Sequence, residues 1–192
     1  MIPGLILAAG ASSRMGRPKA LLDASGRTFV ARLVETLHYG GVRPVAVVIR
    51  PGARDLALEI VRAGATPVVN RAADDGQLSS LLTGLAAVAD VAPAVLVTLV
   101  DAPAIRPTSI AAMLAREPAS PASILRATYR GRHGHPVVFR RRVFDALRQA
   151  DPTVGAKAVL RAHAVEDVEV DDPGVVDDID TPEDYARVFG VS

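Results

Sequence analysis

Short apolar runs alternate with segments of helical periodicity along the whole of this 192-residue chain. The segments carry apolar residues three or four positions apart, as Phe29, Leu33, Val34 and Leu37 do. This alternation predicts a Rossmann-like α/β fold, a mostly parallel sheet with helices on both faces. We expect strands at 2–7, 45–49, 67–69, 94–100, 123–128, 137–139 and 165–170, and helices at 28–39, 53–63, 77–89, 107–116, 141–150, 154–162 and 181–189.

The length and composition favour one domain, residues 1–192, with no repeat and no linker. No cysteine is present, which excludes disulfides and thiolate metal sites. No apolar run approaches the roughly 20 residues of a membrane span, and the apolar start is too short for an export signal. We therefore expect a cytoplasmic protein that does not bind membranes.

Charge is distributed unevenly although the net charge is only +1. Residues 126–148 contain seven arginines and one acid, whereas residues 166–184 contain ten acids and no lysine or arginine. Apolar residues interrupt the acidic run at strand-like spacing, so we expect it to be folded rather than a solvated tail. Aromatic residues make up 4% of the chain, too few to support a nucleic-acid surface.

The stretch Leu5–Lys19 joins the first expected strand to a loop of small residues that contains Gly10 and Gly16. Small side chains let the backbone approach a ligand, and successive backbone N–H groups form a concavity for anions. Arg14 and Lys19 add positive charge, so the loop suits a triphosphate. Neither the P-loop spacing nor G-x-G-x-x-G is present, and an ordinary βα turn remains the alternative.

Asp101 directly follows the apolar run 94–100, which has the composition of a central strand. In open α/β sheets ligands bind beyond the carboxyl ends of the strands. We expect Asp101 to lie at the same edge as the glycine loop and to bind Mg²⁺ with a triphosphate. The alternative is that Asp101 only organises the turn before Pro103.

A second acidic cluster occupies 177–184, where Thr181-Pro182 has the pattern of a helix start. Asp178 and Asp180 project to one side of an extended segment, so both carboxylates are candidates for contact with a ligand there.

Gln77, Ser79 and Ser80 come at the start of an expected helix. A serine at this point either caps the helix or contacts a ligand.

Residues 131–136 are expected to form a loop between two strands, in which Gly134 allows an unusual φ and His135 donates a hydrogen bond. The His133-x-His135 pair suggests zinc only weakly, because no third ligand is nearby. Arg132 offers positive potential to a phosphorylated acceptor.

The loop sequence resembles the L-A-A-G-x-x-x-R-M-G-x-x-K signature of the molybdenum cofactor cytidylyltransferase-like family of nucleotidyltransferases. The signature's fixed positions are occupied by Leu7, Ala8, Ala9, Gly10, Arg14, Met15, Gly16 and Lys19. Further family strings follow in order: S-S-L at 79–81, D-x-P at 101–103, G-H-P-V-x-F at 134–139 and D-I-D-T-P-E-D at 178–184.

The resemblance implies the nucleotide-diphospho-sugar transferase-like fold and the Mg²⁺-dependent transfer of CMP from CTP to the phosphate of molybdopterin. It implies catalytic roles for Arg14, Lys19 and Asp101, and metal binding by Asp101 and Asp180. It also implies nucleotide binding by Leu7, Ala8, Ala9, Gly10, Gly16, Gln77, Ser79 and Ser80, and acceptor binding by Arg132 and His135. A molybdenum hydroxylase is the client that such an enzyme would serve.

Two alternatives remain at this level. Ala102 departs from the bulkier residue that the family has between Asp101 and Pro103, which leaves another phosphorylated acceptor open. The same fold could also carry an accessory protein or a nicotinamide- or flavin-dependent reductase.

Overall fold

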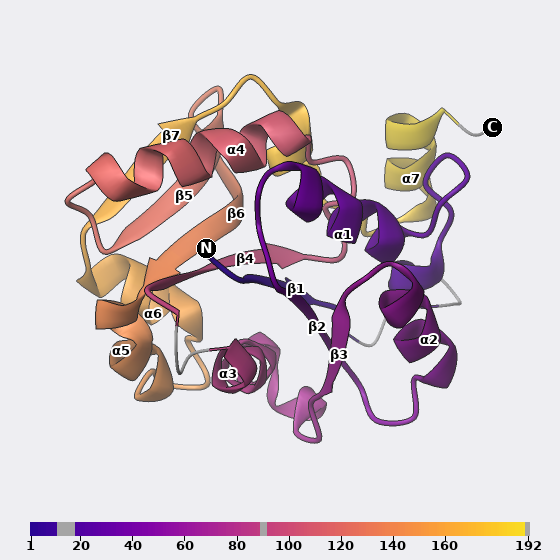
Figure 1. The fold of residues 1–192 in the computed structure, drawn as a ribbon, viewed down its shortest axis with the longest axis horizontal. Coiled ribbons are helices and arrows are strands. Elements are labelled where there is room, and N and C mark those ends of the chain that lie inside the picture. Colours follow the sequence, from indigo (N-terminus) through magenta and orange to yellow (C-terminus); the bar gives the residue numbers. More distant parts are fainter. Residues whose placement is uncertain (11–17, 89–91, 191–192) are drawn as a thin grey trace.

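The computed structural model describes residues 1–10, 18–88 and 92–190, which form one seven-stranded sheet with helices on both faces (Figure 1). The strand order is β3-β2-β1-β4-β6-β5-β7. The strands are β1 (Gly4–Leu7), β2 (Val45–Ile49), β3 (Thr66–Val69), β4 (Ala94–Leu99), β5 (Ile124–Tyr129), β6 (Arg132–Arg140) and β7 (Val165–Glu169). The helices are α1 (Phe29–Tyr39), α2 (Arg54–Arg62), α3 (Gln77–Val88), α4 (Pro107–Arg116), α5 (Phe144–Arg148), α6 (Ala156–Ala162) and α7 (Pro182–Phe189).

The expected α/β fold with a mostly parallel sheet is confirmed, and one strand runs antiparallel to its neighbours. Strands β1, β2, β3 and β4 pair in parallel, and so do β5 and β7, whereas β6 runs antiparallel to both β4 and β5. β5 and β6 are joined by a tight hairpin whose central residues, Arg130 and Gly131, have φ of 50° and 73°. Two positive φ angles in succession match the twist of a two-residue hairpin.

The loop expected at 131–136 is wrong, because β6 already begins at Arg132. Gly134 has no positive φ, but a Cβ there would lie 1.8 Å from the carbonyl oxygen of Val175. The glycine is therefore required by a close approach of the C-terminal segment to β6. The single helix expected at 141–150 is also divided, into a 3-10 turn at Arg141–Val143 followed by α5.

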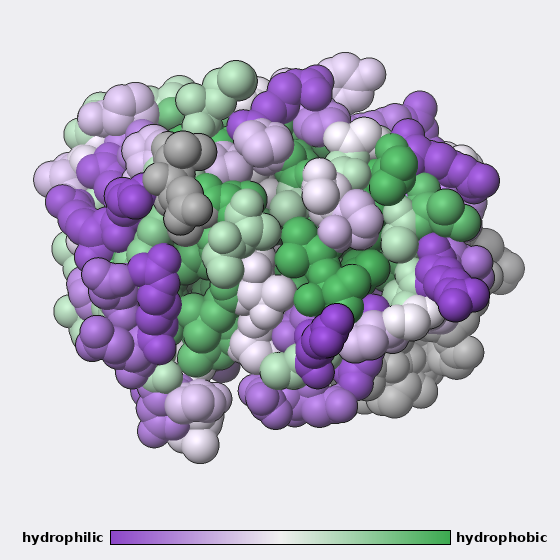
Figure 2. All heavy atoms as spheres, turned by 60° about the horizontal axis from the view of Figure 1, so that its bottom comes forward, coloured by the Kyte–Doolittle hydropathy of each residue, from purple (hydrophilic) through white to green (hydrophobic). Residues whose placement is uncertain are grey.

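Two apolar clusters cover the faces of the sheet. Side chains of α1, α2 and α4 pack on one face, with α7 added at its edge, while α3, α5 and α6 pack on the other. Figure 1 shows α1 and α4 on the side opposite α3 and α5. Figure 2 shows the molecule from the side of α3, where exposed apolar residues lie among hydrophilic ones. No helix in the described residues is long and apolar enough to cross a membrane.

Gly84 allows α3 to approach the sheet closely. A Cβ at this position would lie 2.8 Å from Val48 Cγ2 and 3.1 Å from Leu5 Cδ1, in the buried contact of α3 with β2 and β1. Branched valine side chains adapt poorly to such overpacking.

We predict that Gly84→Ala lowers the free energy of unfolding by about 1–3 kcal/mol, because the overlap outweighs alanine's better helix propensity. Urea unfolding followed by circular dichroism measures the change. Ala86→Gly, at an exposed position of the same helix, calibrates the propensity contribution. A more stable Gly84→Ala variant would contradict the packing argument.

Candidate active site

A cleft of about 510 Å³ opens at the carboxyl ends of the central parallel strands. Its walls come from β1 and the loop after it, from β4 and its following turn, and from the segments before α3 and α7. The lining residues are Leu7, Ala8, Ala9, Gly10, Lys19, Arg50, Ala73, Asp74, Gly76, Gln77, Ser80, Leu99, Val100, Asp101 and Asp180. This is the edge at which such sheets bind ligands.

Lys19 lies in the cleft at the start of a short 3-10 turn, Lys19–Leu21. Its Nζ donates to Asp180 Oδ1 at 2.5 Å, and 12% of its side chain is exposed. The structure thus joins two candidates that lie 161 positions apart in sequence. Arg14 and Gly16 lie outside the described residues, and their roles stay predictions.

Asp101 lies at the end of β4, where its backbone carbonyl accepts a hydrogen bond from Ile179 N at 2.8 Å. Its Oδ1 is buried and has no hydrogen-bond partner among the residues that the structure describes. Burial, together with the charges of Asp178 and Asp180, raises the pKa of Asp101 to about 6, although Lys19 opposes the shift. A buried polar atom without a partner is uncommon, so Oδ1 points to an interaction with a ligand.

Asp178 and Asp180 approach Asp101 from the C-terminal segment. Desolvation raises the pKa of Asp178, and Asp180 and Asp177 raise it further, against Lys19 and Arg132. The structure leaves both candidates at the site: Asp180 lines the first cleft, and Asp178 lines the neighbouring one.

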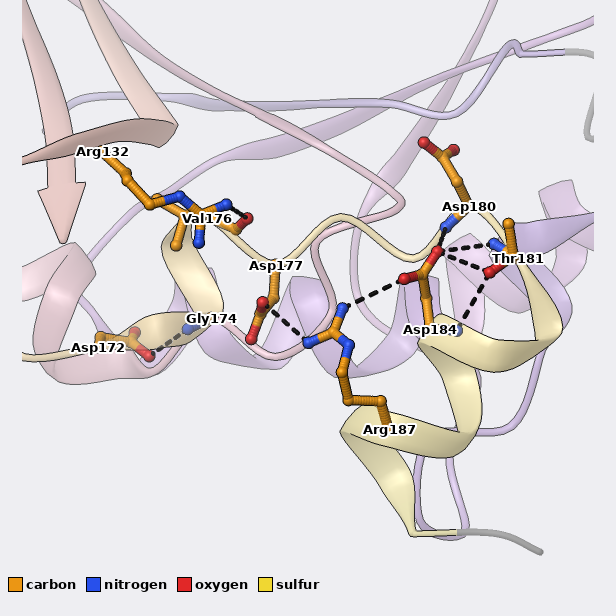
Figure 3. Close-up of polar contacts among 9 residues, drawn as sticks. All are labelled: Arg132, Asp172, Gly174, Val176, Asp177, Asp180, Thr181, Asp184 and Arg187. Carbon is orange, nitrogen blue, oxygen red and sulfur yellow. Dashed lines mark hydrogen bonds and ion pairs between the residues drawn. The ribbon is translucent and has the colours of Figure 1, made fainter. Parts of the chain in front are cut away.

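A capping box holds the segment before α7 (Figure 3). Asp184 Oδ2 accepts from Thr181 N at 3.0 Å and from Asp180 N at 3.2 Å, while Asp184 N donates to Thr181 Oγ1 at 3.1 Å. Arg187 lies between Asp184 and Asp177 and donates to both, at 3.3 and 3.1 Å. These contacts hold the backbone of Asp180 so that its carboxylate points away from the helix (Figure 3).

The carboxylates suit a divalent cation that also binds phosphate oxygens. Mg²⁺ takes oxygen ligands and is commonly held by one or two carboxylates together with substrate phosphates. Within residues 1–10, 18–88 and 92–190, no three histidine, cysteine or carboxylate side chains are grouped to hold a metal by themselves. The unpartnered Oδ1 of Asp101 and the adjacent Asp180 fit a cation whose remaining ligands come from elsewhere.

The two serines of the first turn of α3 have different positions. Ser80 is buried and lines the cleft with Gln77. Ser79 Oγ instead lies 2.7 Å from the Ala72 carbonyl and 2.8 Å from that of Gly76, outside the cleft lining. Ser79 therefore ties the start of α3 to the loop before it, and it does so by donating to carbonyl groups rather than by accepting from N–H groups as a helix cap does.

Arg50 is a cleft residue that sequence reasoning missed. It directly follows β2 and donates from Nη1 to the carbonyl of Ala9 at 3.1 Å, while Nη2 pairs with Asp74. Its position after an apolar strand was the available signal, because Asp101 follows β4 in the same way. Arg50 ties the loop after β1 to the segment before α3.

A second cavity, of about 660 Å³, adjoins the first and shares Leu7, Gln77 and Leu99 with it. Its further lining comes from the face of the sheet that α3 and α6 cover, and from residues 152–157. It includes Leu81, Val97, Arg126, His133, His135, Val137, Phe139, Lys157, Leu160, Val175 and Asp178.

The two residues expected to bind the acceptor are separated. His135 lines the second cavity, and burial lowers its pKa to about 4, against a hydrogen bond to the Val97 backbone, so the ring is neutral near pH 7. Arg132 is exposed, with Nη2 3.5 Å from the carbonyl of Val176, and is absent from the lining of both cavities. The hairpin turns its side chain toward the C-terminal segment instead.

The fold and the cleft define the class of NTP transferases. The chain belongs to the MobA-like NTP transferase domain family, whose model matches residues 4–168.

Individual relatives carry different names. The chain is 34% identical to a nicotine blue oxidoreductase of Paenarthrobacter nicotinovorans, over 98% of this chain and 96% of the relative. The crystal structure of Rv0371c from Mycobacterium tuberculosis H37Rv is similar over all of both chains, with 26% identity and a TM-score of 0.85, and a second structure of it is a complex with manganese. A nucleotidyl transferase from Methanothermobacter shares the fold, with a TM-score of 0.83 at 22% identity over 99% of this chain and 96% of its own.

We predict that Asp101→Asn makes the metal-free protein more stable near pH 7.5. The carboxyl has a pKa of about 6 in the folded state, above the roughly 3.9 of an unfolded chain, so folding favours its neutral form. The stability that Asp101 contributes is present below pH 4 and is lost as the pH rises through 6. Asparagine removes this loss and should raise Tm by roughly 2–4 °C at pH 7.5, with a smaller gain toward pH 4.

Differential scanning calorimetry in EDTA measures this effect. Asp171→Asn, at an exposed position, is the matched control and should leave Tm unchanged. An Asp101→Asn protein that is less stable than the wild type at pH 7.5 would contradict the buried, unpartnered state of this carboxylate.

Proposed function

We propose that this protein is a Mg²⁺-dependent nucleotidyltransferase that transfers CMP from CTP to the phosphate of molybdopterin and releases pyrophosphate. The observation that carries the proposal is the meeting of Lys19, Asp101 and Asp180 in the first cleft, which adjoins the second cavity at Leu7, Gln77 and Leu99. One cavity is lined by the small-residue loop, as a nucleotide requires, and the other offers room for an acceptor.

In this reaction an oxygen of the acceptor phosphate attacks the α-phosphorus of CTP. A new P–O bond forms as the bond to the bridging oxygen of the β-phosphate breaks, and pyrophosphate leaves with that electron pair. The attacking phosphate is already ionised near neutral pH, so the protein needs no general base. Its task is to align the two substrates and to stabilise charge.

The first cleft would bind CTP. The loop residues Leu7, Ala8, Ala9 and Gly10 bring backbone close to the nucleotide, and Gln77 and Ser80 line its other side. The Lys19 ammonium would stabilise charge on the phosphoryl oxygens, with Arg14 in the same role. The Ala8-Ala9 pair, which resembles the cytidylyltransferase signature, supports CTP.

Asp101 and Asp180 would hold the Mg²⁺. When bound, the cation neutralises phosphate charge and fixes the line of attack. The manganese complex of the related Rv0371c supports a divalent metal in this family. Lys19 would then exchange its contact with Asp180 for contacts with phosphate oxygens.

The second cavity would hold the acceptor beside the α-phosphate. Leu7, Gln77 and Leu99 line both cavities, so the two bound substrates would be in contact there. His135 contributes a neutral ring to this cavity rather than a charge.

A second candidate function is reduction of a planar organic substrate. It is favoured by the relative named nicotine blue oxidoreductase, which matches this chain at 34% identity over nearly its full length. A reductase would have no evident use for Lys19, Asp101 and Asp180 in the first cleft. The two functions differ in co-substrate, so one set of assays separates them.

The first test is pyrophosphate release with each of the four nucleoside triphosphates, with and without molybdopterin, in Mg²⁺ or EDTA. We expect release only with CTP, molybdopterin and Mg²⁺ together. NADH or NADPH oxidation is followed in parallel. Tight CTP binding without release would indicate another acceptor or an accessory protein, and nicotinamide oxidation with a dye substrate would support the reductase.

We predict that Lys19→Ala and Asp101→Ala each lower kcat/KM by roughly 10²-fold or more, because each removes an electrostatic stabiliser of the reacting phosphates. Steady-state pyrophosphate release measures the loss. Arg116→Ala is the control and should retain wild-type kinetics, because Arg116 lies at the end of α4 and lines neither cavity. Near-normal turnover by either site variant would refute these assignments.

A further inference from the structure

The second cavity runs across the sheet rather than along one strand. Its floor is formed by side chains of β1, β4, β6 and β5, all on the face covered by α3 and α6. The register places these residues in two rows: Leu7 pairs with Leu99, and two residues back along β4 Val97 pairs with Val137, which pairs with Arg126. The cavity therefore extends from the nucleotide edge toward β5.

The width of the sheet sets the length of a molecule that fills this cavity. Neighbouring strands lie about 4.8 Å apart, and β4, which ends two residues before Asp101, is two strand intervals from β5. Along the strands, Arg126 is in register with Val97, four residues before Asp101. Two strand intervals and four residues together separate the backbones of Arg126 and Asp101 by roughly 15 Å. An acceptor that reacts near Asp101 must span most of this distance to meet the long side chain of Arg126.

The middle of the cavity is apolar. Val97, Val137 and Phe139 form the floor, and Leu81 and Leu160 line the helical side. Such walls suit a flat ring system and offer little to a sugar or a polyanion.

Arg126 is the hydrogen-bond donor at the β5 end of the cavity, and its side chain is held by an ion pair. Its Nε and Nη2 each lie 2.8 Å from Asp167 Oδ1 on β7, which pairs with Arg126 in register. His133 Nε2 lies 3.3 Å from Oδ2 of the same carboxylate. The guanidinium is thereby oriented and its charge is largely neutralised, which favours a neutral oxygen acceptor over an anion.

We propose that Arg126, oriented by Asp167, recognises the lactam oxygen of a planar heterocycle at the far end of the acceptor. This inference rests on the proposed function and deepens it, because it assigns the end of the acceptor opposite the reacting phosphate. Arg126 is then a specificity-determining residue, and Asp167 is the residue that positions it.

The experiment uses pterin, which carries the lactam oxygen and is fluorescent, and 2,4-diaminopteridine, in which an amino group replaces that oxygen. Each is titrated by fluorescence into the wild type, Arg126→Met, Asp167→Asn and Arg116→Met. Arg116 is the matched control because it pairs with Glu166 on the same strand as Asp167, from the other face of the sheet.

We expect the wild type to bind pterin more tightly than 2,4-diaminopteridine. Loss of a hydrogen bond from a charged donor should weaken pterin binding by Arg126→Met roughly 10- to 100-fold and remove the preference between the two probes. Asp167→Asn should reduce the preference by a smaller factor, since the arginine remains but is less well oriented. Arg116→Met should match the wild type, and CTP affinity should be unchanged in all variants.

Three results would overturn the inference: no pterin binding by the wild type, equal binding of the two probes, or an Arg126→Met variant that keeps the preference. Transfer assays with molybdopterin separate this outcome from failure of the proposed function. A transferase whose KM for molybdopterin is unaffected by Arg126→Met refutes the inference alone. An Arg126-dependent pterin site in a protein that transfers nothing refutes the proposed function alone.

Discussion

The site depends on the contact between the turn after β4 and the C-terminal segment. Ile179 N donates to the carbonyl of Asp101, which brings two further carboxylates toward a carboxylate that is already desolvated. Like charges at this separation repel, and the Lys19 ammonium offsets the repulsion through its contact with Asp180. The cleft is therefore held in a charged arrangement whose repulsion a bound cation would relieve.

Contacts outside the cleft supply the stability for that arrangement. The buried Asp172 carboxylate accepts from Ser109 Oγ at 2.6 Å, from Arg106 N at 2.8 Å and from Gly174 N at 3.0 Å, so it fastens the segment to the start of α4. Farther along, Tyr185 and Phe189 of α7 stack with Phe29 of α1, with ring centroids 6.1 and 5.7 Å from it. Apolar and hydrogen-bonding contacts at both ends thus compensate for electrostatic strain between them.

Regular patterns made much of this structure predictable. The runs at 45–49 and 107–116 coincide with β2 and α4, because continuous apolar residues and a proline start leave few alternatives. The sequence was enough to assign Lys19, Asp101 and Asp180 to one site, because Asp101 follows an apolar run and the other two lie in family strings. The start of β6 could not be predicted, since it depends on which strands become neighbours, whereas Arg50 was missed although it directly follows the apolar run 45–49. For Gly134 the sequence suggested an unusual φ, but the glycine is needed because the backbone of Val175 lies against it. That contact joins distant segments, so no local pattern predicts it.

The family match ends at residue 168, while Asp178 and Asp180 lie beyond it. A chain interrupted there would still contain the loop after β1, Asp101 and nearly the whole sheet, but neither of these carboxylates. A boundary placed by homology alone would thus yield a fragment that has one wall of the first cleft and only part of its acidic side. The chain is synthesised from its N-terminus, so Lys19 can pair with Asp180 only after residue 180 has left the ribosome.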